Sequence, residues 1–202
     1  MTFPTPTCLL RGTRVSSLLG DVPVETLKIG DLIQSSVTGE YRAVRWIGRR
    51  LLDGSTFDAD QRKVHLPVRI SRNAIAQDLP ARDLYISPGH ALLIGEYGVS
   101  ARLLINGSSI RQVDAMEEIE YFHIELDSHD GMYAAGLPVE TYLEADNRQA
   151  YDNAAEYEAL YPGDDPRVQQ PCVKIDIPLA ALDRIRSNVN ERAAQIELTE
   201  IA

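Results

Sequence analysis

From residue 8 to about residue 142 the chain alternates apolar and polar residues in short runs. The runs at 13–16 and 41–48 are clear examples, and Gly, Asp or Asn residues separate many of the runs. A period of two residues predicts strands with one buried face, and the separating residues predict tight turns. Further runs lie at 22–25, 31–34, 64–70, 84–94, 99–104, 121–126 and 132–142. No stretch before residue 140 has a helical period, so the sequence predicts a body that is nearly all β.

After residue 142 the pattern changes. Residues 147–160 are rich in alanine and polar side chains, which predicts a weak helix or an ordered arm. Near the C-terminus apolar side chains recur at helical spacing, at Leu179, Leu182, Ile185, Val189 and Ile196. This spacing predicts an amphipathic helix of about five turns. We expect its apolar stripe to dock on the β body or on a second subunit, because a membrane-surface helix would need a basic polar face.

One correspondence recurs within the β body at an offset of 77 residues. It relates Val22, Leu27, Gly30 and Ile33 to Val99, Leu104, Gly107 and Ile110. Four identities can also arise by chance. A true repeat would predict one β subdomain built twice and joined about a pseudo-two-fold axis.

Composition and charge limit the classes of protein to which this chain can belong. The 202 residues are 44% hydrophobic and 25% charged, which is typical of a globular protein with one or two cores. The net charge of -10 divides unevenly: residues 1–142 carry 14 basic and 18 acidic side chains, and residues 143–202 carry 6 and 12. This balance argues against a nucleic-acid partner, because phosphate binding needs clustered Lys and Arg.

The chain has no apolar run long enough to span a membrane. Its first seven residues lack the basic start and apolar core of a secretory signal, so we expect a cytoplasmic protein. Its two cysteines, Cys8 and Cys172, could form at most one disulfide, and neither belongs to a CxxC pair. We expect no metal and no cofactor.

All four histidines lie in the β body with Cys8. A neutral thiol is a weak nucleophile, so a reactive Cys8 would need a base, and His90 is a candidate partner. Ser87 and His90 lie at the two ends of a predicted tight turn, where they could converge on one polar group. Each could equally be a structural residue. His123 and His129 do not have the spacing of common zinc ligands.

Read in order, five blocks of this sequence resemble the Hint domain, the module shared by Hedgehog autoprocessing domains and inteins. The blocks are residues 8–15, 24–33, 87–90, 121–126 and 129–139. The closest likeness is to bacterial Hint-domain proteins, and it implies an all-β horseshoe with an internal pseudo-two-fold axis. It divides the chain into a short leader (1–7), a Hint domain (8–142) and an acidic extension with the C-terminal helix (143–202).

The resemblance implies an N–S acyl shift at the Thr7–Cys8 bond. The Cys8 thiol would attack the Thr7 carbonyl and convert the peptide bond into a thioester. His90 would protonate the leaving nitrogen, and Ser87, at a position where the family usually has Thr, would orient the scissile carbonyl. His129 matches a histidine of the last block, and His123 stands where the family often has Asp; both are expected near the site. The substrate would be the protein's own N-terminal peptide, and water or a small external nucleophile would resolve the thioester.

Two departures from the family limit this activity. Glu140 and Thr141 stand where an intein has its terminal His-Asn, so full splicing is not expected. Residues 44–49 hold no acid that could activate a sterol, so sterol transfer is not supported.

Two alternatives remain open. In the first, the domain is a catalytically silent Hint-fold interaction or assembly module that contacts a protein partner through residues 143–202. In the second, it is a cysteine hydrolase for outside substrates. The hydrolase is less favoured, because such enzymes place the cysteine at a helix N-terminus and Cys8 leads into strands.

Overall fold

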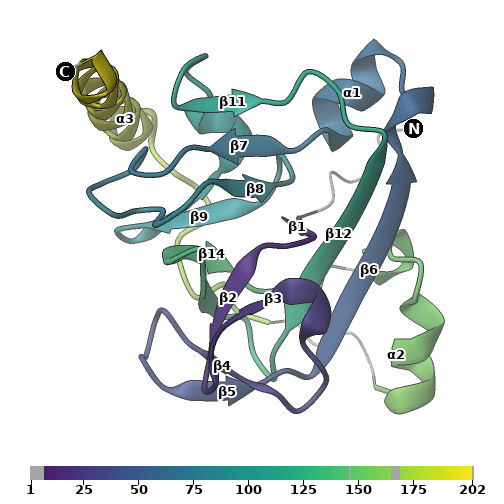
Figure 1. Cartoon of the computed structure of the whole chain (residues 1–202). Helices are drawn as coiled ribbons and strands as arrows, with labels where there is room; N and C mark the ends of the chain where they lie inside the picture. Colours follow the sequence, from purple (N-terminus) through teal and green to yellow (C-terminus); the bar gives the residue numbers. More distant parts are fainter. Residues whose placement is uncertain (1–6, 146, 165–168, 202) are drawn as a thin grey trace.

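The computed structural model describes residues 7–145, 147–164 and 169–201, and β-strands make up most of the body (Figure 1). The strands are β1 (Leu9–Leu10), β2 (Arg14–Ser17), β3 (Gly20–Pro23), β4 (Leu32–Gln34), β5 (Tyr41–Ala43), β6 (Trp46–Asp53), β7 (Val68–Ile70), β8 (Leu84–Ile86), β9 (Ala91–Ile94), β10 (Tyr97–Ser100), β11 (Ile110–Gln112), β12 (Glu118–Glu125), β13 (Gly131–Ala134) and β14 (Leu137–Glu140). The helical segments are η1 (Val24–Thr26), η2 (Gly54–Thr56), α1 (Ala59–His65), η3 (Ala101–Leu104), η4 (Arg148–Ala150), α2 (Ala154–Leu160) and α3 (Leu179–Ile201). The prediction of a mainly β body with a C-terminal helix is confirmed.

The strands form two curled antiparallel sheets. One has the order β11-β7-β8-β1-β12-β6, and the other has the order β10-β9-β14-β13-β2-β4-β5, with β3 beside β2. The long strands β6 and β12 pair over eight residues each and run side by side in Figure 1. Strand β6 is the outer strand of its sheet, so one of its edges is open to a further chain segment.

The offset of 77 residues recurs in the secondary structure. It relates β2, β3, η1 and β4 to β9, β10, η3 and β11, in the same order. Leu9 and Ile86, which are also 77 residues apart, pair with each other in antiparallel register. A residue pairs with its own equivalent only where a two-fold axis passes between them, so the pseudo-axis lies between β1 and β8.

The equivalent turns also share their backbone geometry. Gly30 and Gly107 both have a positive φ, +91° and +80°, a conformation that side chains with a Cβ rarely adopt. The buried side chains that follow them, Ile33 and Ile110, are equivalent as well. The four identities in the sequence therefore mark a true repeat.

The interior contains two clusters of buried residues. The larger is aliphatic and lies between the sheets. The smaller, called here the aromatic cluster, consists of Cys8, Trp46, Leu66, Ile119, Tyr121, Tyr142, Tyr151 and Tyr157. Two of these tyrosines come from beyond residue 142, so the C-terminal segment contributes to the core of the body.

Helix α1 is absent from the sequence prediction. It has only seven residues, too few to display a helical period, but its N-terminus is marked. Asp58 accepts from the backbone of Gln61, and the Gln61 side chain accepts from the backbone of Asp58. This capping box, an Asp followed three residues later by a Gln, is a pattern in the sequence that indicates the start of a helix.

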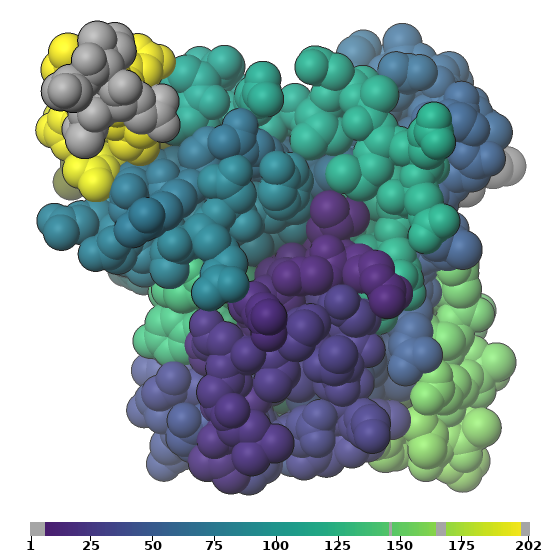
Figure 2. Space-filling view, in the orientation of Figure 1, coloured from purple at the N-terminus to yellow at the C-terminus, as the bar shows by residue number. Residues whose placement is uncertain are grey.

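The C-terminal segment occupies two sides of the body, with α2 beside β6 and α3 at the opposite corner (Figure 2). The predicted weak helix at 147–160 is short, since only η4 and α2 form there. Helix α3 is longer than predicted, at 23 residues, and buries Leu182 and Val189. Leu179 was expected in the buried stripe but is 69% exposed, because it begins the helix. Among the described residues, no helix is long and apolar enough to cross a membrane.

Candidate functional site

Cys8 lies at the start of β1 and is fully buried in the aromatic cluster. Its backbone N–H donates to Oγ of Ser87 at 2.8 Å, across 79 positions in the sequence. Its carbonyl accepts from the Ser87 N–H at 2.9 Å. Ser87 thus contacts the nitrogen of the Thr7–Cys8 bond through its hydroxyl and the carbonyl oxygen of Cys8 through its backbone N–H. The register in which β1 pairs with β8 presents the Cys8 amide to Ser87. Orientation of the Thr7 carbonyl by Ser87 stays a prediction.

The turn from Ser87 to His90 joins β8 to β9 and is closed by a bond from the His90 N–H to the Ser87 carbonyl, at 3.1 Å. Its equivalent in the first repeat is closed by the same bond, from Thr13 to Leu10, also at 3.1 Å. Because the pseudo-axis passes between β1 and β8, it brings the second turn over Cys8. The duplication therefore explains why these distant residues meet.

His90 is fully buried, and its ring lies 5.4 Å from the ring of His123, centroid to centroid. Burial lowers the pKa of His90 to about 3, so its imidazole is neutral at pH 7. Neither ring nitrogen meets a described residue at ordinary hydrogen-bond geometry, although the Glu140 backbone lies near enough to offset part of the lowering of the pKa. A neutral imidazole can receive one proton and release another.

His123, on β12, contacts both Tyr151 and Thr7. Its Nδ1 lies 2.8 Å from Oη of Tyr151 and 3.2 Å from Oγ1 of Thr7, the residue before Cys8. The Tyr151 hydroxyl is in turn 4.0 Å from Sγ of Cys8. Burial holds the pKa of His123 well below its usual value. The sequence prediction did not include Tyr151, and no motif singled it out.

The Cys8 thiol is neutral in this environment. Burial raises its pKa to about 12, and the hydrogen bond with Tyr151 opposes that shift only in part. At pH 7 such a thiol would be ionised in about one molecule in 10⁵. Any attack by Cys8 therefore depends on removal of its proton during the reaction.

His129 lies close to this group but is held by the C-terminal segment. Its Nδ1 accepts from the backbone N–H of Cys172 at 2.9 Å, and its Nε2 lies 4.0 Å from Oε2 of Glu140. The other carboxylate oxygen of Glu140 accepts from the Ala91 N–H at 2.8 Å. Burial raises the pKa of Glu140 to about 7, which makes this carboxyl a titratable group near the site.

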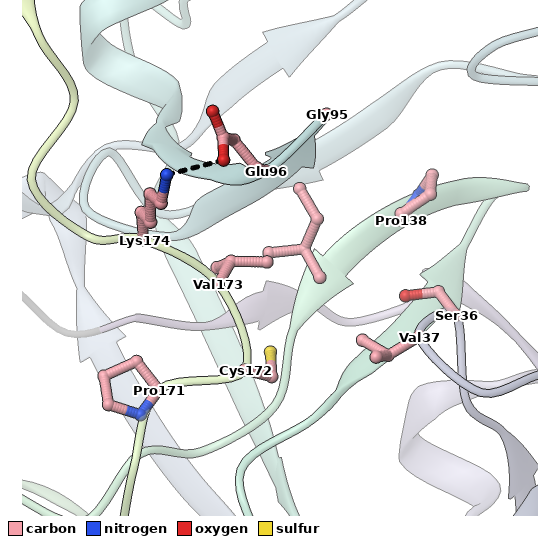
Figure 3. Close-up of a pocket in the computed structure, with 10 residues that line it drawn as sticks. Ser36, Val37, Gly95, Glu96, Pro138, Pro171, Cys172, Val173 and Lys174 are labelled. Atoms are coloured by element: carbon pink, nitrogen blue, oxygen red, sulfur yellow. Dashed lines mark hydrogen bonds and ion pairs between the residues drawn. The ribbon is translucent and has the colours of Figure 1, made fainter.

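An open pocket of about 670 Å³ lies beside Cys172 (Figure 3). The ion pair between Lys174 and Glu96, 2.6 Å from Nζ to Oε2, borders it. The residues that line this pocket are Ser36, Val37, Leu93, Gly95, Glu96, Pro138, Pro171, Cys172, Val173 and Lys174. Cys8, Ser87 and His90 are not among them, so the pocket and the Cys8 site are separate features. Within the described ranges, no three His, Cys, Asp or Glu side chains are grouped to hold a metal ion.

The sequence profile of the Hint domain matches residues 7–146, well over half of the chain. The chain belongs to the Hint domain family. The two curled sheets, the internal two-fold and the turn over Cys8 are accordingly the Hint fold of this protein, as the sequence resemblance predicted. The curated proteins contain no match to the chain.

Several solved Hint-type structures are similar to this one. The gp41-1 intein is 16% identical, over 66% of this chain and 98% of its own, with a TM-score of 0.45. The DnaB intein from Synechocystis is 12% identical, over 68% and 100%, with a TM-score of 0.46. A bacterial intein-like domain from Clostridium thermocellum is 13% identical, over 68% and 99%, with a TM-score of 0.47.

Proposed function

We propose that this Hint domain cleaves its own chain at the Thr7–Cys8 bond through an N–S acyl shift. Membership of the Hint family supports an autoprocessing type of domain in general. The observation that carries the specific reaction is the hydrogen bond from the Cys8 amide to Oγ of Ser87, with the rings of His90 and His123 beside it. Ser87 thus contacts the nitrogen of the Thr7–Cys8 bond, His123 contacts the Thr7 side chain, and His90 lies next to His123.

In the first step, Sγ of Cys8 loses its proton and bonds to the carbonyl carbon of Thr7. The carbon–nitrogen bond then breaks, and the Cys8 nitrogen takes up a proton as its electron pair returns to it. We assign Ser87 to holding this nitrogen and His90 to proton delivery, with His123 and His129 as supporting groups. Because His90 is neutral at pH 7, it acts by accepting one proton as it gives another, not as a standing imidazolium.

Water or an external thiol or amine then resolves the thioester, which leaves a chain that begins at Cys8. Full splicing is not proposed, since Glu140 and Thr141 occupy the positions of the intein His-Asn pair. Thr141, at the asparagine position, has no side-chain amide nitrogen that could cyclise onto its own peptide bond. The reaction turns over once per chain.

Intact mass spectrometry of fresh protein with dithiothreitol or hydroxylamine tests the proposal. We expect the wild type to lose residues 1–7, Cys8→Ala to stay whole, and His90→Ala to cleave about 100-fold or more slowly. Cys172→Ala is the matched control and should cleave at the wild-type rate. Wild-type protein that stays whole under all conditions would overturn the proposal.

A second candidate is a silent Hint-fold module that binds a protein partner through residues 143–202. The complete burial of Cys8, with its thiol pKa raised to about 12, favours this reading. The same mass measurement separates the two, because a silent module keeps its N-terminal peptide in every reagent.

A further inference from the structure

Tyr151 comes from outside the stretch that matches the Hint family. It follows η4 and is 4% exposed, in edge-on contact with the ring of Trp46 at 5.5 Å between centroids. Its ring lies over Gly48 of β6, and a Cβ added there would come within 2.7 Å of a Tyr151 ring carbon. A glycine at this position therefore leaves room for the Tyr151 ring.

The segment that carries Tyr151 is bonded to the open edge of β6. Asp152 accepts from the Leu51 N–H at 2.7 Å, and its own N–H donates to the Arg49 carbonyl at 2.8 Å. Asn153 accepts from the Arg49 N–H at 2.8 Å and donates to the Ile47 carbonyl at 2.9 Å. Side chains make three of these four bonds, so Asp152 and Asn153 cap the edge of β6 without forming a further strand. The position of the Tyr151 hydroxyl is fixed by the body of the domain.

The Tyr151 hydroxyl links the nucleophile to a base. Oη lies 4.0 Å from Sγ of Cys8 and 2.8 Å from Nδ1 of His123. A hydroxyl has one proton to donate and can also accept one. With His123 neutral and its ring proton on Nε2, the thiol donates to Oη and the O–H donates to Nδ1, an arrangement that uses both contacts.

We infer that Tyr151 is a further catalytic residue of this Hint domain, whose hydroxyl passes the proton of the Cys8 thiol to Nδ1 of His123. The inference rests on the proposed self-cleavage. The S–H proton goes to Oη as the phenol proton goes to Nδ1, and the sulfur electron pair forms the bond to the Thr7 carbonyl carbon. When the carbon–nitrogen bond breaks, His90 gives its ring proton to the Cys8 nitrogen, and His123 passes the proton taken from the thiol to the other ring nitrogen of His90, so the step consumes no proton overall.

Two features of the site support a relay over a free thiolate. The phenol pKa of Tyr151 is raised well above its usual value by burial, so the hydroxyl stays neutral and can only pass a proton on. The Cys8 thiol is likewise neutral at rest. The consequence is that the extension is part of the reacting site, and the residues that match the Hint family do not complete it alone.

Tyr151→Phe in the full chain tests the relay, because it removes one oxygen and keeps the ring. Tyr142→Phe is the matched control, since its ring packs 6.0 Å from that of Tyr151 but its hydroxyl bonds to Asn147. With dithiothreitol in mass spectrometry, we expect cleavage by Tyr151→Phe to slow by about 100-fold and that of Tyr142→Phe to change by less than about threefold.

The pH profile gives a readout that a merely structural role would not change. With an internal base, the wild-type cleavage rate should vary little between pH 7 and 8. Without the relay, Tyr151→Phe depends on hydroxide, and its rate should rise about tenfold over the same pH unit. Equal rates and equal profiles for Tyr151→Phe and the wild type would overturn the relay while leaving self-cleavage intact. Wild-type protein that never cleaves would overturn both.

Folding of the variant is checked by the fluorescence of Trp46, the single tryptophan of the chain, which packs against Tyr151. If the emission of Tyr151→Phe differs from that of the wild type, 3-fluorotyrosine at position 151 replaces it in the test. This substitution keeps the hydroxyl and with it the relay, so the rate should still vary little between pH 7 and 8. A rate that rises about tenfold over that unit with 3-fluorotyrosine would contradict the relay.

Discussion

The two cysteines of this Hint domain both lie where the C-terminal segment meets the body, yet their surroundings differ. Cys8 is fully buried, its amide bonds to Ser87, and its thiol faces the Tyr151 hydroxyl. Cys172 is partly exposed at an open pocket, and its backbone N–H bonds to His129. Burial raises both thiol pKa values, to about 12 and about 11.

The acidity of the thiol therefore does not distinguish the candidate nucleophile from an ordinary cysteine in this protein. What separates them is the set of partners. Cys8 has a serine on its peptide nitrogen and a hydroxyl that leads to an imidazole. The following predictions test this difference, from the largest expected effect to the smallest.

Alkylation rates should differ most. A maleimide at pH 7 should modify Cys172 at least about 100-fold faster than Cys8, because a fully buried thiol reacts only after a local opening that costs about 3 kcal/mol. Peptide mapping by mass spectrometry measures both rates in one sample. Unfolding in urea should abolish the difference, and equal rates in the native protein would contradict the burial of Cys8.

Replacing a glycine by alanine should lower the unfolding free energy more near Cys8 than near Cys172. At Gly48 a Cβ would meet the rings of Tyr151 and Trp46 at 2.7 and 2.9 Å, so Gly48→Ala should cost about 3 kcal/mol in urea unfolding. Gly98→Ala is the matched variant, since its Cβ would come no closer than 3.2 Å to a Val173 methyl. It should cost less than about 1 kcal/mol. A larger loss for Gly98→Ala would reverse the comparison.

Stability should depend on pH through His90. Its pKa is about 3 in the folded chain against an ordinary value of 6.5, so its contribution is fully present above pH 6.5 and is lost as pH falls towards 3. Between pH 7 and pH 5, His90 should lower the unfolding free energy by about 2 kcal/mol. His90→Gln, compared in a Cys8→Ala background by urea unfolding at both pH values, should remove that loss.

Glu140 titrates in the opposite sense. Its folded pKa of about 7 exceeds the ordinary value of 4.5, so its contribution is present below pH 4.5 and is lost as pH rises through 7. Glu140→Gln should therefore make the rise of stability between pH 5 and pH 7 steeper, where His90→Gln makes it shallower. Slopes that change in the same direction would contradict these assignments.

The smallest effect is expected at the Cys172 pocket. Lys174 and Glu96 form an ion pair with both side chains more than half exposed. Exposed pairs contribute little because water and salt screen them, so Lys174→Ala and Glu96→Gln should leave the urea midpoint unchanged. A clear loss in both variants would mean that the arm around Cys172 stabilises the domain more than its contacts suggest.

Much of the fold could be predicted from the sequence. The alternation of apolar and polar residues predicted the β body. The offset of 77 residues indicated the internal two-fold axis, because equivalent turns need glycine at Gly30 and Gly107. The block order gave Cys8, Ser87, His90 and His123 as neighbours. The contact made by Ser87 could not be predicted, since it depends on the register in which β1 meets β8.

Tyr151 could not be predicted either. It lies in a segment whose local signals are weak, and its place in the site depends on the edge of β6 and on the space above Gly48. Such a contact is set by the tertiary fold, because it joins residues more than 100 positions apart.

The sequence by itself determined the family, indicated the repeat and named Cys8, Ser87, His90, His123 and His129 as groups that could act on the Thr7–Cys8 bond. It did so because turns, strand periods and motif spacing are local properties of the chain. Only the tertiary structure decided which atoms these groups touch and what their charges are. Burial sets the pKa of Cys8 and His90, and the packing of a distant segment supplies the hydroxyl between a thiol and an imidazole.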